Sequence, residues 1–290
     1  MIKVYGTVYR IHPLFTVMMV LAVATGYFFE LITLFGIVLI HELGHMAAAK
    51  GFGWRVREVK LLPFGGVAET DESGNVPARE EIIVAIAGPA QHVWMIALAS
   101  LFVHWGIWDA EWASYFIKGN LMICLINLLP IPPLDGGRIC QALCSYWISF
   151  YRTITLCAGI GLFLGVSVCI AGLASLASGG IQLNLFVIGL FLAYSNWYGY
   201  RHRTFHFFRF LLGRDHRSAQ KVAAGTLAQP IVVPRQKTVW EIIRMFMREK
   251  YHLIYVVGER GRIEAVLPEQ RITACFLEEK KAQCAVSELL

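Results

Sequence analysis

Charged residues are scarce in this sequence: Asp, Glu, Lys and Arg make up 16% of its 290 residues, whereas 57% are hydrophobic. A soluble domain carries about 25% charged residues and keeps most of its surface polar, so this composition excludes a wholly soluble protein. The apolar content also excludes intrinsic disorder. Seven scattered cysteines, an odd number in a long chain, exclude a secreted scaffold held by disulfides. The remaining class is a polytopic α-helical membrane protein.

Six apolar segments approach the length of about 20 residues that crosses a bilayer as a helix. Within residues 1–200 we therefore expect about six transmembrane helices, at residues 12–29, 31–49, 81–103, 113–129, 153–177 and 181–200. Lys and Arg are absent from the loops around residues 30, 109–111 and 178–180, but they occur before the first span and in the alternate loops. Because basic residues concentrate in cytoplasmic loops, this alternation places both termini in the cytoplasm.

The positive charge of the chain is concentrated after the last apolar segment. Residues 1–200 hold ten Lys/Arg and eleven Asp/Glu, whereas residues 201–290 hold sixteen and nine, a net charge of +7. A basic chain can bind nucleic acid, but residues 201–217 place their basic side chains beside four phenylalanines directly after a span. This pattern favours an amphipathic linker that binds anionic membrane lipids, and no nucleic-acid partner. A simple charge cluster that stops membrane insertion is the alternative.

Residues 218–290 have the pattern of a small soluble α/β domain. We expect strands at residues 229–233, 253–257 and 263–267, and helices at 238–249 and 268–276. Thr238 is a suitable N-cap for the first of these helices, because its hydroxyl can accept a hydrogen bond from a backbone N–H of the first turn.

Residues 53–75, between the second and third spans, predict one or two short strands broken by a turn at Gly65-Gly66. Non-helical backbone at a membrane is tolerated only where protein or a water-filled cavity covers it. An interfacial loop and a segment that contacts a substrate are both open interpretations.

The second span contains His41-Glu42-Leu43-Gly44-His45. Helical residues four apart lie on one face, so the two imidazoles can chelate one metal ion, as in HExxH zinc hydrolases. Glu42 can then accept a proton from water that the metal activates. An ionisable group inside a bilayer costs roughly 2.5 kcal/mol or more unless it is paired. Three such groups within one short segment therefore indicate a metal or a water-filled cavity.

A catalytic zinc site uses three protein ligands and keeps an open position, so a third ligand is required. The candidate is Asp135, in a proline-rich segment (residues 127–137) whose three prolines and two glycines must unwind the end of the fourth span. Asp135 and the two histidines lie near the cytoplasmic ends of their spans, at the shared depth that common coordination requires. An ordinary solvent-exposed turn is the alternative interpretation.

The HExxH motif in one span and the proline-rich segment after a later one together resemble the site-2 protease family of intramembrane zinc metalloproteases. The resemblance covers about residues 1–200. It implies a zinc ion held by His41, His45 and Asp135, with Glu42 as general base and acid.

The same resemblance implies substrate contacts. Asn127 would orient the substrate or stabilise the oxyanion, a role that its amide donor can serve. The substrate would add as a strand to the segment of Phe64, Gly65 and Gly66. Pro133, in the proline-rich segment, is a further candidate substrate contact.

One position departs from the family pattern. The family more often has an asparagine a few residues after a Gly-Pro pair, where this chain has Gly88-Pro89 followed by Gln91 and His92. Gln91 could replace that amide, but we assign it no role. We expect His92 to be a packed or interfacial histidine rather than a ligand.

Residues 218–290 resemble a single cystathionine-β-synthase (CBS) domain in their order of strand, helix, strand, strand and helix. CBS modules usually work in pairs and often bind adenosine nucleotides. The resemblance therefore implies a homo-oligomer formed through this domain, with ATP as a candidate ligand. A structural cap without a ligand is the alternative.

Six spans followed by a CBS domain resemble the sporulation proteases of the family. This resemblance implies cleavage of a membrane-tethered protein, the precursor of sigma factor K (pro-sigma-K), in the mother-cell membrane around the forespore. It also implies inhibition by partner membrane proteins.

Two other functions stay open on the residues alone. A CBS-regulated metal transporter would use the same four ionisable side chains as a transport site, but spans five and six offer few polar residues for a path through the bilayer. A non-proteolytic membrane scaffold would bind clients in the same cavity, but it would have no need of Glu42 as a base.

Overall fold

The computed structural model describes residues 2–4, 7–11, 13–54, 56–62, 65–70, 76–175, 182–258, 261–279 and 282–290. The chain divides into two compact units, residues 1–139 and residues 140–290. Each unit combines long helices with one small β-sheet. The candidate metal ligands all lie in the first unit.

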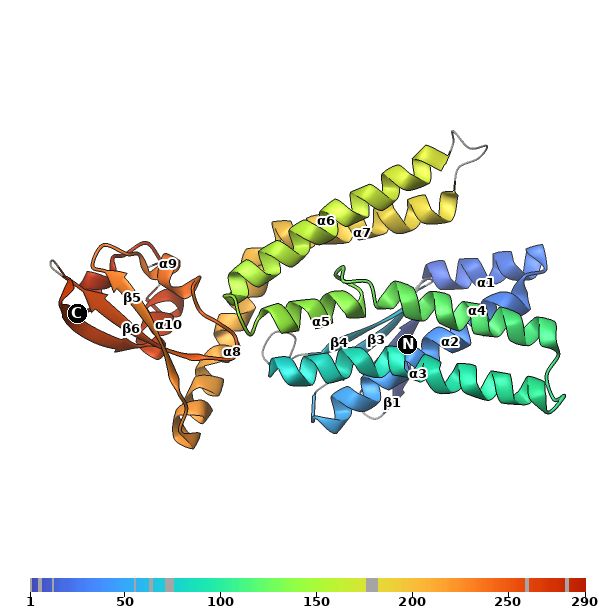
Figure 1. The fold of residues 1–290 in the computed structure, drawn as a ribbon, viewed down its shortest axis with the longest axis horizontal. Helices are drawn as coiled ribbons and strands as arrows, with labels where there is room; N and C mark the ends of the chain where they lie inside the picture. The colour runs from blue at the N-terminus through green and yellow to red at the C-terminus, as the bar shows by residue number, and fades with distance from the viewer. Residues whose placement is uncertain are drawn as a thin grey trace. The chain divides into compact units, whose positions relative to one another are not determined.

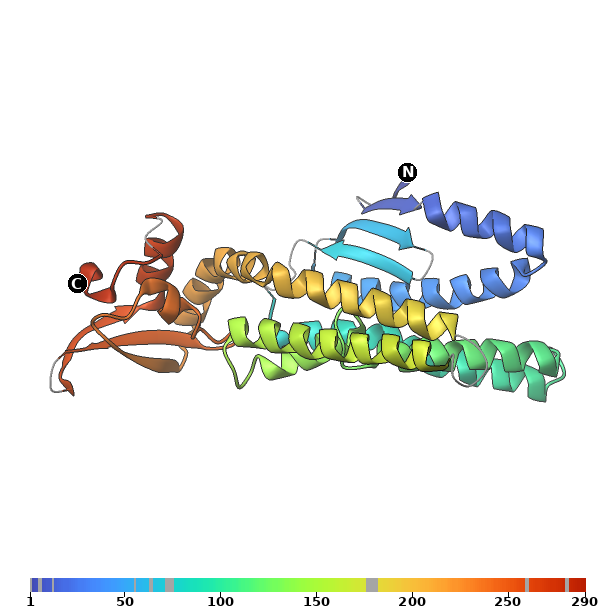
Figure 2. The same cartoon turned by 90° about the horizontal axis from the view of Figure 1, so that it is seen from above.

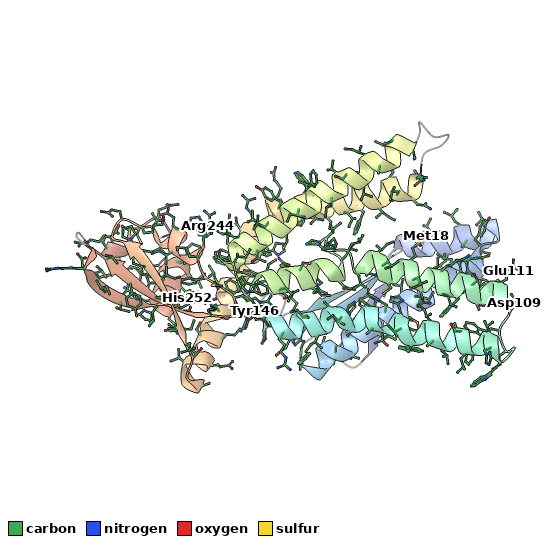
Figure 3. The ribbon with its side chains drawn as sticks, viewed as in Figure 1. Met18, Asp109, Glu111, Tyr146, Arg244 and His252 are labelled. Atoms are coloured by element: carbon green, nitrogen blue, oxygen red, sulfur yellow. The ribbon has the colours of Figure 1, made fainter. Side chains whose placement is uncertain are left out.

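The first unit is built around a short helix and three long ones. The short helix is α1 (Pro13–Thr25), and the long helices are α2 (Phe28–Gly51), α3 (Ala78–His104) and α4 (Ala110–Asn127). Helices α2, α3 and α4 pack side by side (Figure 1). Helix α4 begins after Asp109, which lies beside Glu111 at this end of the helix (Figure 3). The Asp109 carboxylate accepts hydrogen bonds from the backbone N–H groups of Glu111 and Trp112. This cap satisfies N–H groups that have no partner within the helix.

A four-stranded sheet packs against α2 (Figure 2). Its strands lie in the order β1 (Ile2–Val4), β2 (Thr7–Ile11), β3 (Val56–Leu62) and β4 (Gly65–Thr70). Strands β2 and β3 are parallel, and the other neighbours are antiparallel. The short strands predicted within residues 53–75 are confirmed as β3 and β4. The turn expected at Gly65-Gly66 is wrong, because both glycines lie in β4 and pair with Leu62 and Leu61 of β3. Strands β1 and β2 are too short to give a clear sequence pattern. Strand β4 forms one edge of the sheet.

The second unit contains two antiparallel helices, α6 (Phe150–Ala174) and α7 (Leu183–Arg201), which pack along their length (Figures 1 and 2). Glycines allow this close approach. A Cβ atom at Gly165 would lie 2.5 Å from the backbone nitrogen of Ala193, and one at Gly189 would lie 2.5 Å from that of Cys169. Helix α5 (Asp135–Cys144) begins in the first unit and ends in the second, and α8 (Arg203–Ala224) follows α7.

Three of the described helices are long and apolar enough to cross a membrane: α2 with 24 residues, α3 with 27 and α6 with 25. Helices α4 and α7 have 18 and 19 residues. Helix α1 has 13 residues, which rise by about 20 Å, less than the ~30 Å of a hydrocarbon core. The prediction of a polytopic helical protein therefore agrees with the fold, and the number of six spans stays a prediction.

A three-stranded sheet follows α8. The elements are β5 (Ala228–Pro234), α9 (Val239–Ile243), β6 (Tyr251–Val257), β7 (Ile263–Pro268), α10 (Glu269–Leu277) and a 3-10 helix (Val286–Leu289). The central strand β6 is parallel to β5 and antiparallel to β7. The predicted order of strand, helix, strand, strand and helix is confirmed. Helix α8 buries Phe207, Phe210 and Leu211 in the core of this region, so the predicted amphipathic linker is a helix with one packed face.

The helix predicted at residues 238–249 is wrong in length. Thr238 caps it as expected: its hydroxyl accepts from the N–H of Glu241, and the Glu241 carboxylate accepts from the N–H of Thr238. Helix α9 nevertheless ends at Ile243.

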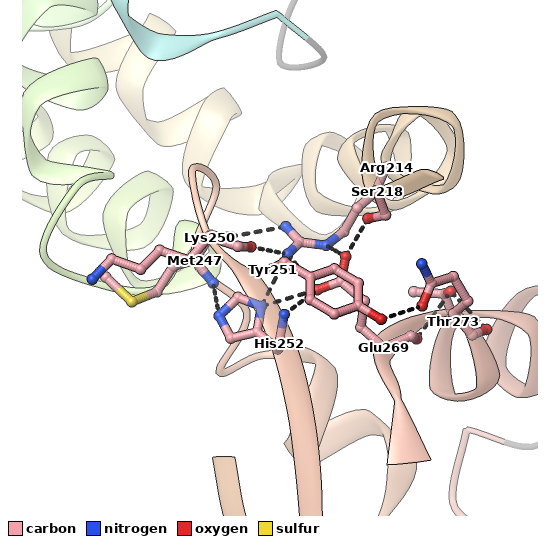
Figure 4. A network of polar contacts seen from close by, with 9 residues as sticks. Arg214, Ser218, Met247, Lys250, Tyr251, His252, Glu269 and Thr273 are labelled. Atoms are coloured by element: carbon pink, nitrogen blue, oxygen red, sulfur yellow. Dashed lines mark hydrogen bonds and ion pairs between the residues drawn. The ribbon is translucent and has the colours of Figure 1, made fainter. Parts of the chain in front are cut away.

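Backbone hydrogen bonds mark this early end. The N–H of Met247 donates to Nε2 of His252, on β6, instead of to the carbonyl of Ile243 four residues before it. After the helix, the carbonyl of Phe246 accepts from the N–H of Phe150, and the guanidinium of Arg214, on α8, donates to the carbonyls of Met247 and Lys250 (Figure 4). The chain after α9 is therefore bonded to residues that are distant in the sequence.

Candidate metal centre

Two imidazoles and one carboxylate converge in the first unit. His41 and His45 lie about one turn apart on α2, and Asp135 is the first residue of α5. The Nε2 atoms of the histidines are 3.0 Å apart, and Oδ2 of Asp135 lies 3.1 Å from that of His41 and 3.2 Å from that of His45. All three side chains are buried. These three residues are the ligands that the sequence predicts. Within the described part of the chain, they form the group of side chains that could hold a metal ion.

A compact turn brings Asp135 to the histidines. The chain leaves α4 and folds back closely on itself before α5 begins. A Cβ atom at Gly136 would collide with the backbone of Leu128, and one at Gly137 would collide with the backbone of Ile131. The glycines of the proline-rich segment are therefore required by this turn, which agrees with the predicted unwinding of the chain after α4.

Helix α3 lies against the two imidazoles at a glycine. A Cβ atom at Gly88 would collide with the ring of His45 and would lie 2.8 Å from Nε2 of His41. The sequence marks the Gly88-Pro89 pair, but the contact depends on how α3 packs on α2, so the sequence alone does not show it.

The far side of each imidazole is hydrogen-bonded. Nδ1 of His45 donates to the carbonyl of Val84 over 2.7 Å, so Nε2 of the neutral ring presents a lone pair. Nδ1 of His41 lies 3.0 Å from Nε2 of His92, which is 1% exposed. Nδ1 of His92 in turn lies 2.9 Å from Oδ1 of Asn120 on α4. His92 is therefore a packed histidine that contacts a candidate metal ligand.

Asn120 has no place in the sequence motifs, yet a signal for it exists. It is a fully buried amide in the middle of an apolar helix. Burying an amide without hydrogen bonds is costly, so a polar residue in such a helix indicates a specific partner. The position of that partner depends on the packing of α3 against α4.

The three converging atoms suit zinc. With its proton on Nδ1, neutral His45 presents an Nε2 lone pair 3.2 Å from the carboxylate of Asp135, and a metal ion or a proton between these two acceptors offsets their repulsion. Ligand atoms 2.0–2.2 Å from a tetrahedral zinc ion are about 3.3 Å from one another. The separations of 3.0–3.2 Å are close to this value. Two imidazoles and one carboxylate are also an established ligand set of catalytic zinc sites.

The predicted base and the predicted substrate-orienting residue lie on the helices that carry this centre. Glu42 follows His41 directly on α2, is half-buried, and lies near enough to His45 for its charge to act on that ring. Asn127 is the last residue of α4 and is half-buried. The Asn127 side chain makes no hydrogen bond to another described residue, so its amide is available for a ligand.

The other predicted substrate contacts lie on the sheet and in the turn before α5. Gly65 and Gly66 begin β4 and pair with the end of β3. Pro133 is exposed and follows a cis peptide bond with Pro132. Phe64 lies outside the described residues.

Gln91, on α3, bonds within its own helix. Its amide nitrogen donates to the carbonyl of Ala87 over 2.9 Å, and its amide oxygen accepts from the indole of Trp94 over 2.8 Å. Both ends of the amide are thus engaged away from the three converging side chains.

Comparisons with known sequences agree with this geometry. Residues 29–119, which include His41 and His45, match the model of peptidase family M50. The chain is 34% identical over 287 residues to stage IV sporulation protein FB of Bacillus subtilis (strain 168), covering 97% of this chain and 95% of that protein. It is 35% identical over 161 residues to zinc metalloprotease MJ0392 of Methanocaldococcus jannaschii, covering 54% of this chain and 46% of that protein.

A solved structure is similar as well. The match is to a site-2 protease from Methanocaldococcus jannaschii, with a TM-score of 0.56 and 26% sequence identity. It covers 69% of this chain and 94% of that structure. The sequence and structure comparisons therefore indicate the same class of protein.

Proposed function

Because this chain belongs to the site-2 protease family of zinc metalloproteases (peptidase family M50), we propose that it cleaves a membrane protein at a zinc ion held by His41, His45 and Asp135. The observation that carries this proposal is the convergence of the three buried side chains, with their ligand atoms 3.0–3.2 Å apart. When bound, zinc would supply Lewis-acid activation of water and of the scissile carbonyl.

Glu42 is the proposed general base and acid. It adjoins His41 on α2 without belonging to the group of ligand atoms. A carboxylate oxygen of Glu42 would take a proton from the attacking water and release it to the nitrogen of the departing amine. Its half-buried position supports this role, because a base must be reachable by water.

Asn127 is the proposed donor for the oxyanion or for the substrate backbone. It ends α4, in the chain segment that leads to Asp135, and its amide is not engaged by another described residue. An amide N–H aimed at developing negative charge stabilises the transition state more than the ground state.

Strand β4 is the proposed docking edge for the substrate. A substrate helix must unwind before its peptide bond can be attacked, and an extended segment can add to a free sheet edge. Strand β4 is an edge strand, begins at Gly65 and Gly66, and packs on α2, the helix that carries both histidines. On this proposal Phe64 and Pro133 are further substrate contacts.

For the substrate, we propose a membrane-tethered pro-sigma factor, pro-sigma-K, processed during sporulation. The support is the 34% identity, over 97% of this chain, to a stage IV sporulation protein. On this proposal the protein lies in the mother-cell membrane around the forespore, and partner membrane proteins inhibit it until a signal arrives.

For the membrane arrangement, we propose six spans with both termini in the cytoplasm. Six helices occupy the predicted segments, and basic residues follow the predicted alternation between loops. Helix α8 would contact the membrane through Phe205 and Leu212, which are exposed on the side opposite to its packed face, while its basic side chains would face anionic headgroups.

For the C-terminal region, residues 218–290, we propose a CBS-like regulatory domain that pairs with a second copy of the chain and binds an adenosine nucleotide such as ATP. The order of β5, α9, β6, β7 and α10 supports the likeness. Residues 1–200 would form the protease domain, and residues 201–217 would form the linker within α8.

Membership in a family of zinc metalloproteases argues against both alternatives, a metal transporter and a non-proteolytic scaffold. A cleavage assay separates the three. The protein is co-expressed with membrane-tethered pro-sigma-K, as wild type, as Glu42→Gln and as Glu111→Gln, an exposed position at the start of α4. We expect cleavage by the wild type and by Glu111→Gln, no cleavage by Glu42→Gln, and equal zinc content in all three. Undiminished cleavage by Glu42→Gln would refute the mechanism.

A further inference from the structure

A chain of hydrogen bonds connects His41 to α4 through a residue on α3. His41, His92 and Asn120 lie on α2, α3 and α4, and all three are buried. The contacts are 3.0 Å from Nδ1 of His41 to Nε2 of His92, and 2.9 Å from Nδ1 of His92 to Oδ1 of Asn120. Three helices that pack side by side thus meet in one line of polar contacts.

The far end of this line fixes the direction of every bond in it. The amide nitrogen of Asn120 donates to the carbonyl of Phe116 over 3.0 Å, so the amide oxygen is the atom that faces His92. An amide oxygen only accepts, so Nδ1 of His92 carries a proton. In neutral His92, Nε2 is then an acceptor, and Nδ1 of His41 must donate to it. Nε2 of His41 is left with a lone pair.

We propose that His92 and Asn120 are positioning residues that hold His41 in the tautomer with its proton on Nδ1, so that Nε2 points its lone pair at the metal. The inference rests on the proposed zinc site and adds to it the residues that prepare one ligand. His45 reaches the same tautomer more directly, through its bond to the carbonyl of Val84.

The hydrogen bonds of His92 go beyond the ordinary packing of a buried histidine. Both ring nitrogens of His92 are engaged, one by a metal-binding side chain and the other by an amide whose orientation is set by a helix carbonyl. Partners of this kind fix the ring orientation and the tautomer of a metal ligand, and their loss typically weakens metal affinity 10- to 100-fold.

Zinc affinity tests the proposal on the full-length protein in detergent micelles, by competition with a chelator. His92→Leu and Asn120→Leu remove the two links, and we expect each to weaken zinc binding about 10- to 100-fold. Val93→Leu is the matched control, because Val93 adjoins His92 but its side chain is exposed. Wild-type affinity in both leucine variants at positions 92 and 120 would overturn the proposal.

The tautomer itself gives a second readout, and its first measurement needs no variant. In metal-free wild-type protein with ¹⁵N-labelled histidine, NMR should show Nδ1 protonated in both His41 and His92, and Nε2 of His92 unprotonated. Asn120→Leu should shift His41 toward the other tautomer, a change that a merely structural role would not produce. An unprotonated Nδ1 in wild-type His41 would overturn the proposal. Absence of zinc binding by the wild type would instead refute the proposed function, and the NMR result would still decide the tautomer.

Discussion

Gly88 of α3 lies in direct contact with the imidazole of His45, and a single methyl group at position 88 would occupy the space of that ring. The contact joins the Gly-Pro pair of one helix to the HExxH motif of another. Helix α3 therefore forms one wall of the centre where the three candidate ligands meet.

We expect Gly88→Ala to abolish or strongly weaken zinc binding, by at least about 10-fold, because the new Cβ displaces the rings of His45 and His41. Zinc content of the purified protein checks this. Gly36→Ala, on α2 where an added Cβ meets nothing within 4 Å, is the control and should bind zinc normally. Equal zinc content in the two variants would show that the contact has no effect on the site.

Asn127→Ala should slow cleavage by about 100-fold, since it removes a donor proposed to stabilise the oxyanion. Zinc content should stay unchanged, because Asn127 is not among the three converging side chains. The measurement is the rate of substrate cleavage with purified protein. A loss of zinc in this variant would instead assign Asn127 a role in metal binding.

The packing of α6 on α7 depends on Gly165. A Leu side chain there would meet the backbone of Ala193, and overpacking of this kind costs about 1–3 kcal/mol. We expect Gly165→Leu to lower the unfolding temperature of the protein in micelles. Gly159→Ala, on the same helix with open space around it, should leave that temperature unchanged or raise it, since alanine favours helix by about 1 kcal/mol.

Glu269 of α10 is a buried carboxylate with several donors (Figure 4). Arg214 donates to its two oxygens over 3.1 and 2.8 Å, the hydroxyl of Ser218 donates to it, and the backbone N–H of His252 donates over 2.8 Å. Burial alone would raise the pKa of Glu269. The His252 imidazole, whose Nδ1 lies 3.1 Å from the carboxylate, together with the charge and hydrogen bonds of Arg214 and the hydroxyl of Ser218, outweighs burial and lowers the pKa from 4.5 to about 2.

The C-terminal region should therefore lose stability in acid. Since the pKa of Glu269 is lower in the folded state, its contribution is present above about pH 4.5 and is lost as the pH falls to about 2. The expected loss is on the order of 3 kcal/mol. Pulse digestion with pepsin in urea, with fragments of residues 225–290 identified by mass spectrometry, measures it. Glu269→Gln should abolish most of this pH dependence, whereas Glu278→Gln, at an exposed position of the same region, should retain it.

The candidate metal ligands were predictable because their signals are local. The HExxH spacing places His41 and His45 on one helical face, and the proline-rich segment marks the turn that carries Asp135. Gly88 and Asn120 were not predictable in their roles, because their contacts arise only when α3 packs between α2 and α4.

In the C-terminal region, too, the features set by local sequence were predictable and those set by distant residues were not. Its strands and the cap at Thr238 come from local patterns and are confirmed. The early end of α9 is marked by the backbone N–H of Met247, which donates to the imidazole of His252 on another element, β6. A local pattern contains no information about such a partner.

X-ray absorption at the zinc edge, on purified full-length protein, tests the central claim most directly. The account predicts one zinc ion per chain, with two imidazole nitrogens, carboxylate oxygen and no sulfur among its ligands. A sulfur shell, contributed by any of the seven cysteines, would contradict it, as would an unchanged zinc spectrum after Asp135→Ala.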